Sequence, residues 1–289
     1  MPGVVTVDVI TPWQFDDPRD AAQFRRIHRP GVELYRAHIV RHAFDAHSHD
    51  GFGLGAIESG VERFRYRGGD HLAPPQSLVL MNPDMLHTGR AETDEGWRYR
   101  MIYIEPAALA DVVGERGWWF TDPVGHDSAA ARRVGALLAA MWASDDPLAL
   151  DSALFELLEA IRPHARGTRP AAVASRAADG ALERALALMH AQLHATLTLE
   201  DLSGAAALSP FHFLRRFKDR HHVTPHQMLM ALRLALAKRK LASGESPADV
   251  AIAVGLVDQA HLTRRFARMY GVTPARYQQQ LGTRPARRA

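Results

Sequence analysis

Short apolar and alternating runs, separated by turn residues, dominate the first 105 residues of the chain. The runs cover residues 32–40, 52–58, 61–66, 77–81 and 97–104, and clusters of Gly, Pro and Asp lie between them. Many short strands with frequent turns are typical of a β-barrel or a β-sandwich. Residues 129–142 and 148–161 instead carry apolar residues at helical spacing, which predicts a helical hairpin.

The second half of the chain has a different pattern. Residues 163–180 are rich in Ala, Arg, Gly and Pro and have little apolar periodicity, which favours a linker. From residue 181 nearly to residue 281 the spacing is helical. We therefore expect an α+β multidomain protein. Its parts are a β-barrel with a helical hairpin (1–162), a linker (163–180) and an all-α domain (181–289).

An internal repeat with an offset of 49 residues marks the helical half. Residues 208–225 read LSPFHFLRRFKDRHHVTP, and residues 257–274 read VDQAHLTRRFARMYGVTP. The residues His212, Arg215, Arg216 and Phe217 recur as His261, Arg264, Arg265 and Phe266. The Val-Thr-Pro that ends the first copy also ends the second. A coincidence of this length is improbable, so the sequence predicts two copies of one structural unit.

Each copy is preceded by a second short helical segment. Thr198 and Ser246 are hydroxyl residues with an acidic residue three positions later, which indicates a helix N-terminus. Each segment ends in a turn of small residues, at Ala206-Ala207 and at Val254-Gly255. A short helix, a tight turn and a basic second helix form a helix-turn-helix, and the chain predicts it twice.

Helical geometry separates the faces of the two second helices. Phe213 and Phe217 fall on one side of the first copy, as do Leu262 and Phe266 in the second, so we expect them in the core. Arg215 and Arg264 fall opposite, where arginine can read guanine in a DNA major groove. Arg216 and Arg265 lie to the side, a position that suits phosphates. The alternative is that these arginines only solvate a surface helix.

Charge and composition narrow the function further. Residues 1–180 carry 19 Arg, no Lys and 25 acidic residues, whereas residues 181–289 carry 16 basic and 7 acidic residues. The net charges of −6 and +9 suggest that only the second part meets a polyanion. The chain has no Cys, which excludes disulfides and thiolate metal sites. We find no membrane-spanning apolar run and no secretion signal, so we expect a cytoplasmic protein.

These residues in order resemble the DNA-binding domain of the AraC/XylS family of bacterial transcription regulators. The resemblance covers about residues 181–282 and rests on Ala251 to Leu256, on Gln259, His261, Arg264 and Phe266, and on Tyr270 to Tyr277. It implies two helix-turn-helix units joined by a long helix, binding to double-stranded promoter DNA, contact with RNA polymerase, and activation as the usual outcome. The expected DNA-binding residues are Phe211, His212, Leu214, Arg215, Arg216, Lys218, Gln259, Ala260, His261, Arg264, Arg265 and Arg268.

The N-terminal part resembles the cupin-like sensor barrel that is often fused to this domain. The matching residues are His47-Ser48-His49-Asp50, then Gly60, then residues 82–87, which read NPDMLH. The resemblance implies a barrel that binds a small-molecule effector. It also implies that the helices within residues 129–162 pair two subunits into a homodimer.

Three histidines are the candidate effector-binding residues. His47 and His49 are two positions apart, so on a strand both side chains would enter the barrel, where His87 could join them. Three imidazoles are also a possible Zn, Mn or Fe set. Catalytic cupins place a Glu four or five positions after the second His, where this chain has Gly53 and Leu54, and Glu58 is too far along.

The same histidines leave an enzyme as the alternative. A metal-dependent cupin enzyme fused to a DNA-binding domain would use such a set. The chain has no nucleophile elbow, phosphate loop or HExxH pattern. We therefore expect a regulator and no enzyme, and we assign no catalytic residue, no metal site and no cofactor from the sequence.

Overall fold

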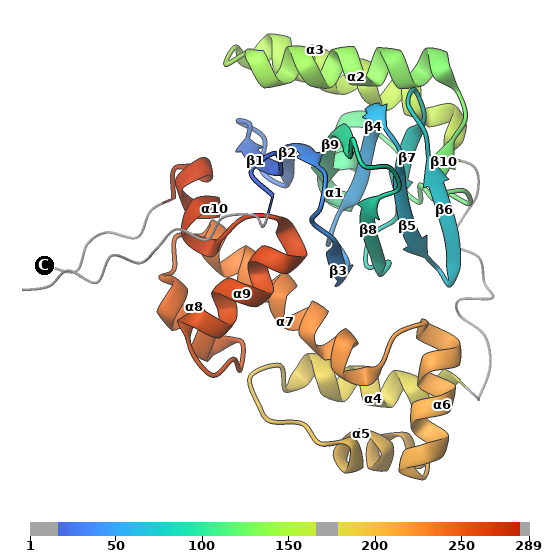
Figure 1. Cartoon of the computed structure of the whole chain (residues 1–289), viewed down its shortest axis with the longest axis vertical. Helices are drawn as coiled ribbons and strands as arrows, with labels where there is room; N and C mark the ends of the chain where they lie inside the picture. The colour runs from blue at the N-terminus through green and yellow to red at the C-terminus, as the bar shows by residue number, and fades with distance from the viewer. Residues whose placement is uncertain (1–16, 166–178, 284–289) are drawn as a thin grey trace, which may run out of the picture.

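The computed structural model describes residues 17–165 and 179–283 and divides them into a β-rich and a helical part. Figure 1 shows helices α2 (Ser128–Ala143) and α3 (Pro147–Ile161) lying over one side of the sheets and the helices of the C-terminal part on the other side. The predicted fold class is confirmed, with a sheet-rich N-terminal part and an all-helical C-terminal part. Residues 166–178, most of the predicted linker, lie outside the described residues.

Within the described residues, ten strands form two sheets. The six-stranded sheet has the order β1-β2-β9-β4-β7-β10 and the four-stranded sheet has the order β3-β8-β5-β6, with antiparallel pairing in both. The strands are β1 (Ala21–Arg26), β2 (Val32–Ile39), β3 (Phe44–His47), β4 (Phe52–Gly60), β5 (Glu62–Tyr66), β6 (Gly69–Ala73), β7 (Leu78–Met81), β8 (His87–Ala91), β9 (Trp97–Ile104) and β10 (Val124–Gly125).

The predicted β-barrel needs one correction, because its two sheets do not close into a barrel. The chain passes from one sheet to the other at Gly60, between β4 and β5, and the two sheets share no continuous hydrogen-bond ladder. Gly60 has φ +70°, and a Cβ there would lie 1.9 Å from the carbonyl oxygen of Gly96. Only glycine fits both the dihedral and the close approach, so the chain turns sharply here. The result is two sheets facing each other with a cavity between them.

Alternation along β9 gives the six-stranded sheet two different apolar faces. Tyr99 and Met101 belong to the apolar cluster between the sheets, whereas Ile102 and Ile104 belong to a second cluster on the outer face. Successive side chains of a strand point to opposite faces, so one strand serves both clusters.

The predicted helical hairpin covers the outer face. Helices α2 (Ser128–Ala143) and α3 (Pro147–Ile161) pack on each other, and α2 packs on β4. The carboxylates of Asp127 and Asp146 cap them by accepting from the backbone amides of Ala130 and Ala149. Helix α1 (Pro106–Val113) and the 3₁₀ turn η1 (Arg162–His164) complete this part.

The helical part contains both predicted helix-turn-helix units. The first unit is α5 (Leu199–Ala206) and α6 (Pro210–His221), and the second unit is α8 (Pro247–Ala253) and α9 (Gln259–Tyr270). The other helices are α4 (Asp179–Ala191), α7 (Pro225–Ala242) and α10 (Pro274–Leu281). Helix α7 joins the two units, and its 18 residues span about 27 Å at 1.5 Å per residue. No helix in the described ranges has the length and apolarity needed to span a membrane.

The predicted helix starts are confirmed by their caps. Thr198 and Asp201 form a capping box, in which each side chain binds the other residue's backbone amide. Ser246 accepts from the amide of Asp249, and Pro247 follows at the first helical position. These caps satisfy backbone donors that have no partner inside the helix, so they define where α5 and α8 begin.

The two turns use different residues for the same left-handed backbone. Gly255 has φ +73°, and a Cβ there would lie 2.6 Å from the carbonyl oxygen of His194, so the position requires glycine. The first unit has Ala207 at φ 54° and ψ 44°, with an exposed side chain. An alanine in this conformation is strained by about 1 kcal/mol.

The helical part packs directly against the sheets. Helices α9 and α7 contact β3, and α10 contacts β1, so residues of both parts share one apolar cluster. At this boundary Lys238 Nζ donates to Glu33 Oε2 at 2.6 Å, and the Tyr277 hydroxyl donates to Glu33 Oε1 at 2.8 Å. The ammonium of Lys238 also lies 4.7 Å from the ring centroid of Phe24. This packing places the second helix-turn-helix unit beside the cavity between the sheets.

The strained turn gives a stability prediction. Replacing Ala207 with Gly relieves the left-handed strain and should raise the free energy of unfolding by roughly 0.5–1 kcal/mol. The matched control is Ala205→Gly inside α5, which should lower it by roughly 0.5–1 kcal/mol. Chemical denaturation of the full chain measures both changes. Equal destabilisation by the two substitutions would contradict the strain at Ala207.

Candidate functional site

The two recognition helices of the helix-turn-helix units place their residues as the periodicity predicts. Phe213 and Phe217 of α6 are buried, as are Leu262 and Phe266 of α9, so these four expected core residues are confirmed. On both helices, the opposite side faces solvent. Arg215 and Arg264 occupy equivalent exposed positions on the two helices.

The remaining predicted DNA-binding residues divide by exposure. Those exposed with Arg215 and Arg264 are Phe211, His212, Leu214, Lys218, Gln259, Ala260 and Arg268. Those half-buried at the flanks are Arg216, His261 and Arg265. Phe211 is 76% exposed, which is unusual for a large apolar side chain. A groove surface that includes thymine methyl groups would give this ring an apolar contact.

The C-terminal end of α9 contacts the β-rich part. The guanidinium of Arg268 lies 3.7 Å from the carboxylate of Asp45. The backbone carbonyl oxygen of Arg268 lies 3.2 Å from Nε2 of His42. The next two residues, Met269 and Tyr270, are buried and line the cavity between the sheets. One helix therefore carries the exposed Arg264 near its middle and forms part of the cavity wall at its end.

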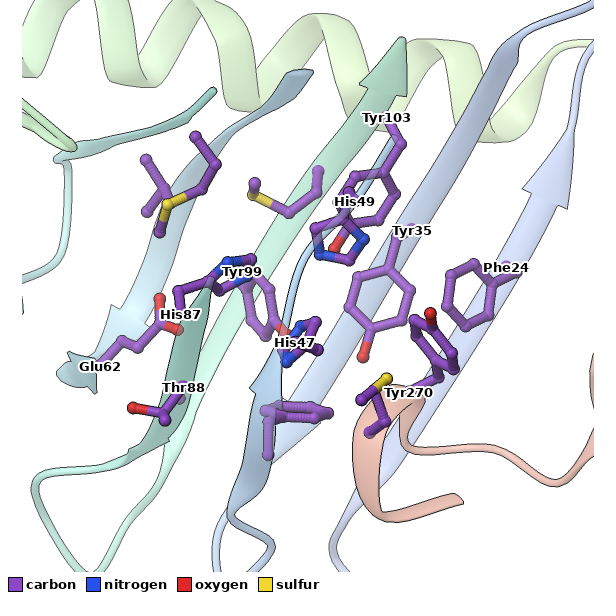
Figure 2. A pocket seen from close by; sticks show the side chains of 16 residues that line it. Phe24, Tyr35, His47, His49, Glu62, His87, Thr88, Tyr99, Tyr103 and Tyr270 are labelled. Carbon is purple, nitrogen blue, oxygen red and sulfur yellow. The ribbon is translucent and has the colours of Figure 1, made fainter. Parts of the chain in front are cut away.

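The three candidate histidines meet in this cavity. His47 on β3 lies directly opposite His87 on β8 in the antiparallel register, and His49 follows β3 two residues later. The ligand nitrogens of the three imidazoles all lie within 4.8 Å of one another. Figure 2 shows the three rings grouped in the cavity below Tyr103. The expectation that these side chains converge is therefore met.

Burial sets the protonation of these rings. Loss of hydration, together with the neighbouring imidazoles, lowers the pKa of His47 and of His49 well below the usual value, and burial lowers the pKa of His87 to about 4. All three are therefore neutral at physiological pH. A neutral imidazole offers one donor and one lone pair, so each ring can bind a polar ligand or a metal ion.

Aromatic side chains form most of the cavity wall. Tyr35, Tyr99 and Tyr103 come from the six-stranded sheet, and Tyr270 comes from α9 (Figure 2). The ring of Tyr103 lies 4.1 Å from the ring of His49 between centroids. The free space left among these side chains is about 40 Å³, which holds only a few water-sized groups.

Glu62 is a cavity residue that the sequence reasoning missed. Its side chain is buried, and its Oε2 has no hydrogen-bond partner among the described residues. Burial raises the pKa of this carboxyl to about 8, so the group is largely protonated at neutral pH. The missed signal was the alternation in β5, where Glu62 shares a face with Phe64 and Tyr66.

The carboxylate of the catalytic cupin pattern is absent from its expected place. Gly53 and Leu54 lie on β4, and Glu58 pairs with Arg100 on β9. Glu62 reaches the same cavity from β5, but it is not among the groups whose ligand atoms lie within 4.8 Å of one another. The arrangement is therefore a three-histidine cluster with a buried carboxyl on another side of the cavity.

A larger cleft of about 400 Å³ adjoins the cavity at the boundary of the two parts. Its lining includes Glu33, Lys238 and Arg239. His49, Tyr103 and Tyr270 line both spaces, so the cleft and the cavity meet at these residues.

Comparison with known families finds a match to each part. The family described as "AraC-like ligand binding domain" matches residues 29–158, and the family described as "Helix-turn-helix domain" matches residues 202–280. The first match covers the two sheets apart from β1, and most of the helical hairpin. The second covers α6 to α9 with most of α5 and α10.

Curated relatives resemble the chain over most of its length. A transcriptional regulator of Bacillus subtilis, YbfI, is 25% identical over 80% of this chain and 86% of its own length. The MmsAB operon regulatory protein of Pseudomonas aeruginosa is 26% identical over 91% of this chain and 83% of its own. The solved structure of an apo variant of ToxT from Vibrio cholerae has the same fold, with a TM-score of 0.55, 12% identity and coverage of 89% of this chain and all of that one. The chain belongs to the AraC family of DNA-binding transcription regulators, with its ligand-binding domain ahead of two helix-turn-helix units.

Proposed function

We propose that this regulator reads operator DNA with α6 and α9 and activates transcription in response to a small effector in the cavity between its sheets. The observation that carries the proposal is the pair of equivalent exposed arginines, Arg215 and Arg264, on two matched helices in the basic half. Each helix can enter a major groove, where arginine binds the O6 and N7 atoms of guanine.

The other exposed and flanking residues of α6 and α9 complete the DNA surface. Arg216 and Arg265 lie at the flanks and suit phosphate contacts, which position the protein without reading sequence. Ala260, one turn before Arg264, cannot donate or accept from its side chain and has little apolar surface, whereas the equivalent residue of α6 is the exposed Phe211, whose ring can contact a thymine methyl group. We therefore expect the first unit to contribute more base specificity.

The effector site is assigned to the cavity with His47, His49 and His87. Sites for small molecules are enclosed, largely apolar and supplied with a few polar groups that set orientation. Here the three imidazoles and the buried carboxyl of Glu62 are those polar groups, and tyrosine rings are the apolar surface. A ligand larger than a few atoms needs the wall to move, because the free space is about 40 Å³.

Helix α9 is the route from the effector to DNA. Tyr270 and Met269 form part of the cavity wall, and Arg268, one residue earlier, is exposed on the proposed DNA surface. A ligand that moves the wall changes the position of α9 relative to α6, and operator affinity depends on that spacing.

The hairpin of α2 and α3 is the proposed dimer surface. Leu148 and Phe155 of α3 are 76% and 48% exposed, and their seven-residue spacing places them on one face two turns apart. A second copy of the chain would cover them. Two chains would place four helix-turn-helix units on one operator, next to RNA polymerase, in the cytoplasm. The domain limits proposed for the chain are 1–162, 163–180 and 181–289.

Base readout gives the first test. Arg215→Ala and Arg264→Ala should each weaken operator binding by about 1–3 kcal/mol and relax the preference at one half-site, with the larger loss for Arg215. Selection from randomised DNA with wild type and both variants measures this. The control is Arg132→Ala on α2, which belongs to neither helix-turn-helix unit. This variant should select the same DNA sequence as the wild-type protein. If both arginine variants select that sequence too, base readout lies elsewhere.

Glu62 gives a pH prediction. The folded protein holds this proton up to about pH 8, whereas the unfolded chain releases it near pH 4.5, so stability falls as pH rises between these values. Glu62→Gln removes this cost. At pH 8.5 the variant should unfold at a higher temperature than wild type, because its free energy of unfolding should be higher by about a few kcal/mol. This difference in free energy should disappear below pH 4.5. A difference that is the same at both pH values would rule out the buried carboxyl as its source.

The dimer surface gives a third prediction. Replacing both Leu148 and Phe155 with Glu should convert a dimer into a monomer, because two buried carboxylates would oppose two more across the contact. Light scattering with size-exclusion chromatography reports the mass. Leu72→Glu, at an exposed leucine on β6, is the matched control and should stay dimeric. A dimeric double variant, or a monomeric wild type, would refute the assignment to α3.

A further inference from the structure

The three-histidine cluster has the composition of a metal site. Three ligand nitrogens from His47, His49 and His87 lie within 4.8 Å of one another. In a tetrahedral centre with metal–nitrogen bonds of 2.0–2.1 Å, ligand nitrogens lie about 3.3 Å apart. The rings therefore need to approach by about 1.5 Å at most. The carbonyl oxygen of His49 accepts from the backbone amide of Asp84 at 2.9 Å, so rotation of the three side chains has to provide this approach.

Backbone carbonyl groups already orient two of the three rings. Nδ1 of His47 lies 2.7 Å from the carbonyl oxygen of Asp45, and Nδ1 of His87 lies 3.1 Å from that of Met85. A carbonyl only accepts, so both Nδ1 atoms carry the proton and donate it. Both Nε2 atoms then keep a free lone pair. Metal-binding histidines are commonly held in this way, with the second nitrogen donating to a carbonyl or carboxylate.

We propose that His47, His49 and His87 bind a divalent transition-metal ion of the kind that imidazole ligands favour, with Zn²⁺ as its simplest representative. Three protein ligands leave at least one position of the ion open. The free space of about 40 Å³ beside the rings admits water or one small donor group of an effector at that position. The regulatory meaning of the ion rests on the function proposed above, but its binding does not.

Two further side chains of the cavity wall lie beside the cluster. Glu62 lines the same cavity, and its Oε2 has no hydrogen-bond partner among the described residues, so this carboxyl can hydrogen-bond water or a donor group bound to the ion. The ring of Tyr270 lies 6.1 Å from that of His47 and 6.4 Å from that of His49 between centroids. An ion that draws these histidines together therefore acts directly beneath the end of α9.

The first test is a titration of the full chain with Co²⁺, monitored by visible absorption. The second is dialysis of the chain against Zn²⁺ and measurement of the bound zinc by elemental analysis. We expect one ion per chain and the d–d absorption bands of a four- or five-coordinate Co²⁺ site. His47→Ala, His49→Ala and His87→Ala should each weaken binding by more than about 100-fold, beyond the usual effect of losing an outer hydrogen bond. His126→Ala, at an exposed histidine of the same part, should bind as wild type does.

The proposal is overturned if the folded wild-type chain takes up no Co²⁺ or Zn²⁺, or if uptake persists when all three histidines are replaced. Circular dichroism shows whether each variant is folded. If the alanine variants unfold, the test becomes the rise in melting temperature that Zn²⁺ causes in wild type and in His49→Gln. An equal rise in the two proteins would overturn the proposal. Operator binding measured in the presence of a chelator tests the DNA-binding function separately, because the proposed DNA contacts do not involve a metal ion.

Discussion

The placement of the helical part depends on the carboxylate of Glu33 on β2. It accepts from the ammonium of Lys238 on α7 and from the hydroxyl of Tyr277 on α10, and all three side chains lie at the boundary of the two parts. The side chains of Lys238 and Glu33 are only 16% and 14% exposed, so an ammonium left here without this carboxylate would be costly and the pair favours this docking position of the helices. That position puts Tyr270 into the wall of the cavity and thereby joins the ligand-binding domain to α9, the helix that we propose reads DNA.

Local features of the fold were predictable because they depend on neighbouring residues. The repeat, the caps at Thr198 and Ser246 and the hairpin of α2 and α3 all follow from spacing and from backbone chemistry within a few positions. The sheet-rich fold was predicted, but the sequence did not show that the sheets stay open, because strand alternation does not determine which strands pair. The turn at Gly60 separates the two sheets, and its constraint comes from Gly96, which is distant in sequence.

The candidate site was only partly predictable for the same reason. The spacing of His47 and His49 indicated a shared cavity, but the approach of His87 depends on the pairing of β3 with β8. Glu62 was visible in the alternation of β5, yet a single acidic residue in an apolar register is easily taken for a strand end. The contribution of Tyr270 could not be inferred, since it results from docking between two parts joined by the predicted linker.

The central claim is that docking of the helices on the sheets controls DNA binding, and the most direct measurement is the operator affinity of a variant altered only at the boundary. Glu33→Ala removes the carboxylate that holds Lys238 and Tyr277, and Glu58→Ala removes a carboxylate paired with Arg100 within the six-stranded sheet. Neither residue belongs to α6 or α9, the helices proposed to read DNA. The account predicts that Glu33→Ala changes the operator dissociation constant several-fold while Glu58→Ala leaves it unchanged. Equal affinities for wild type and a folded Glu33→Ala chain would contradict it.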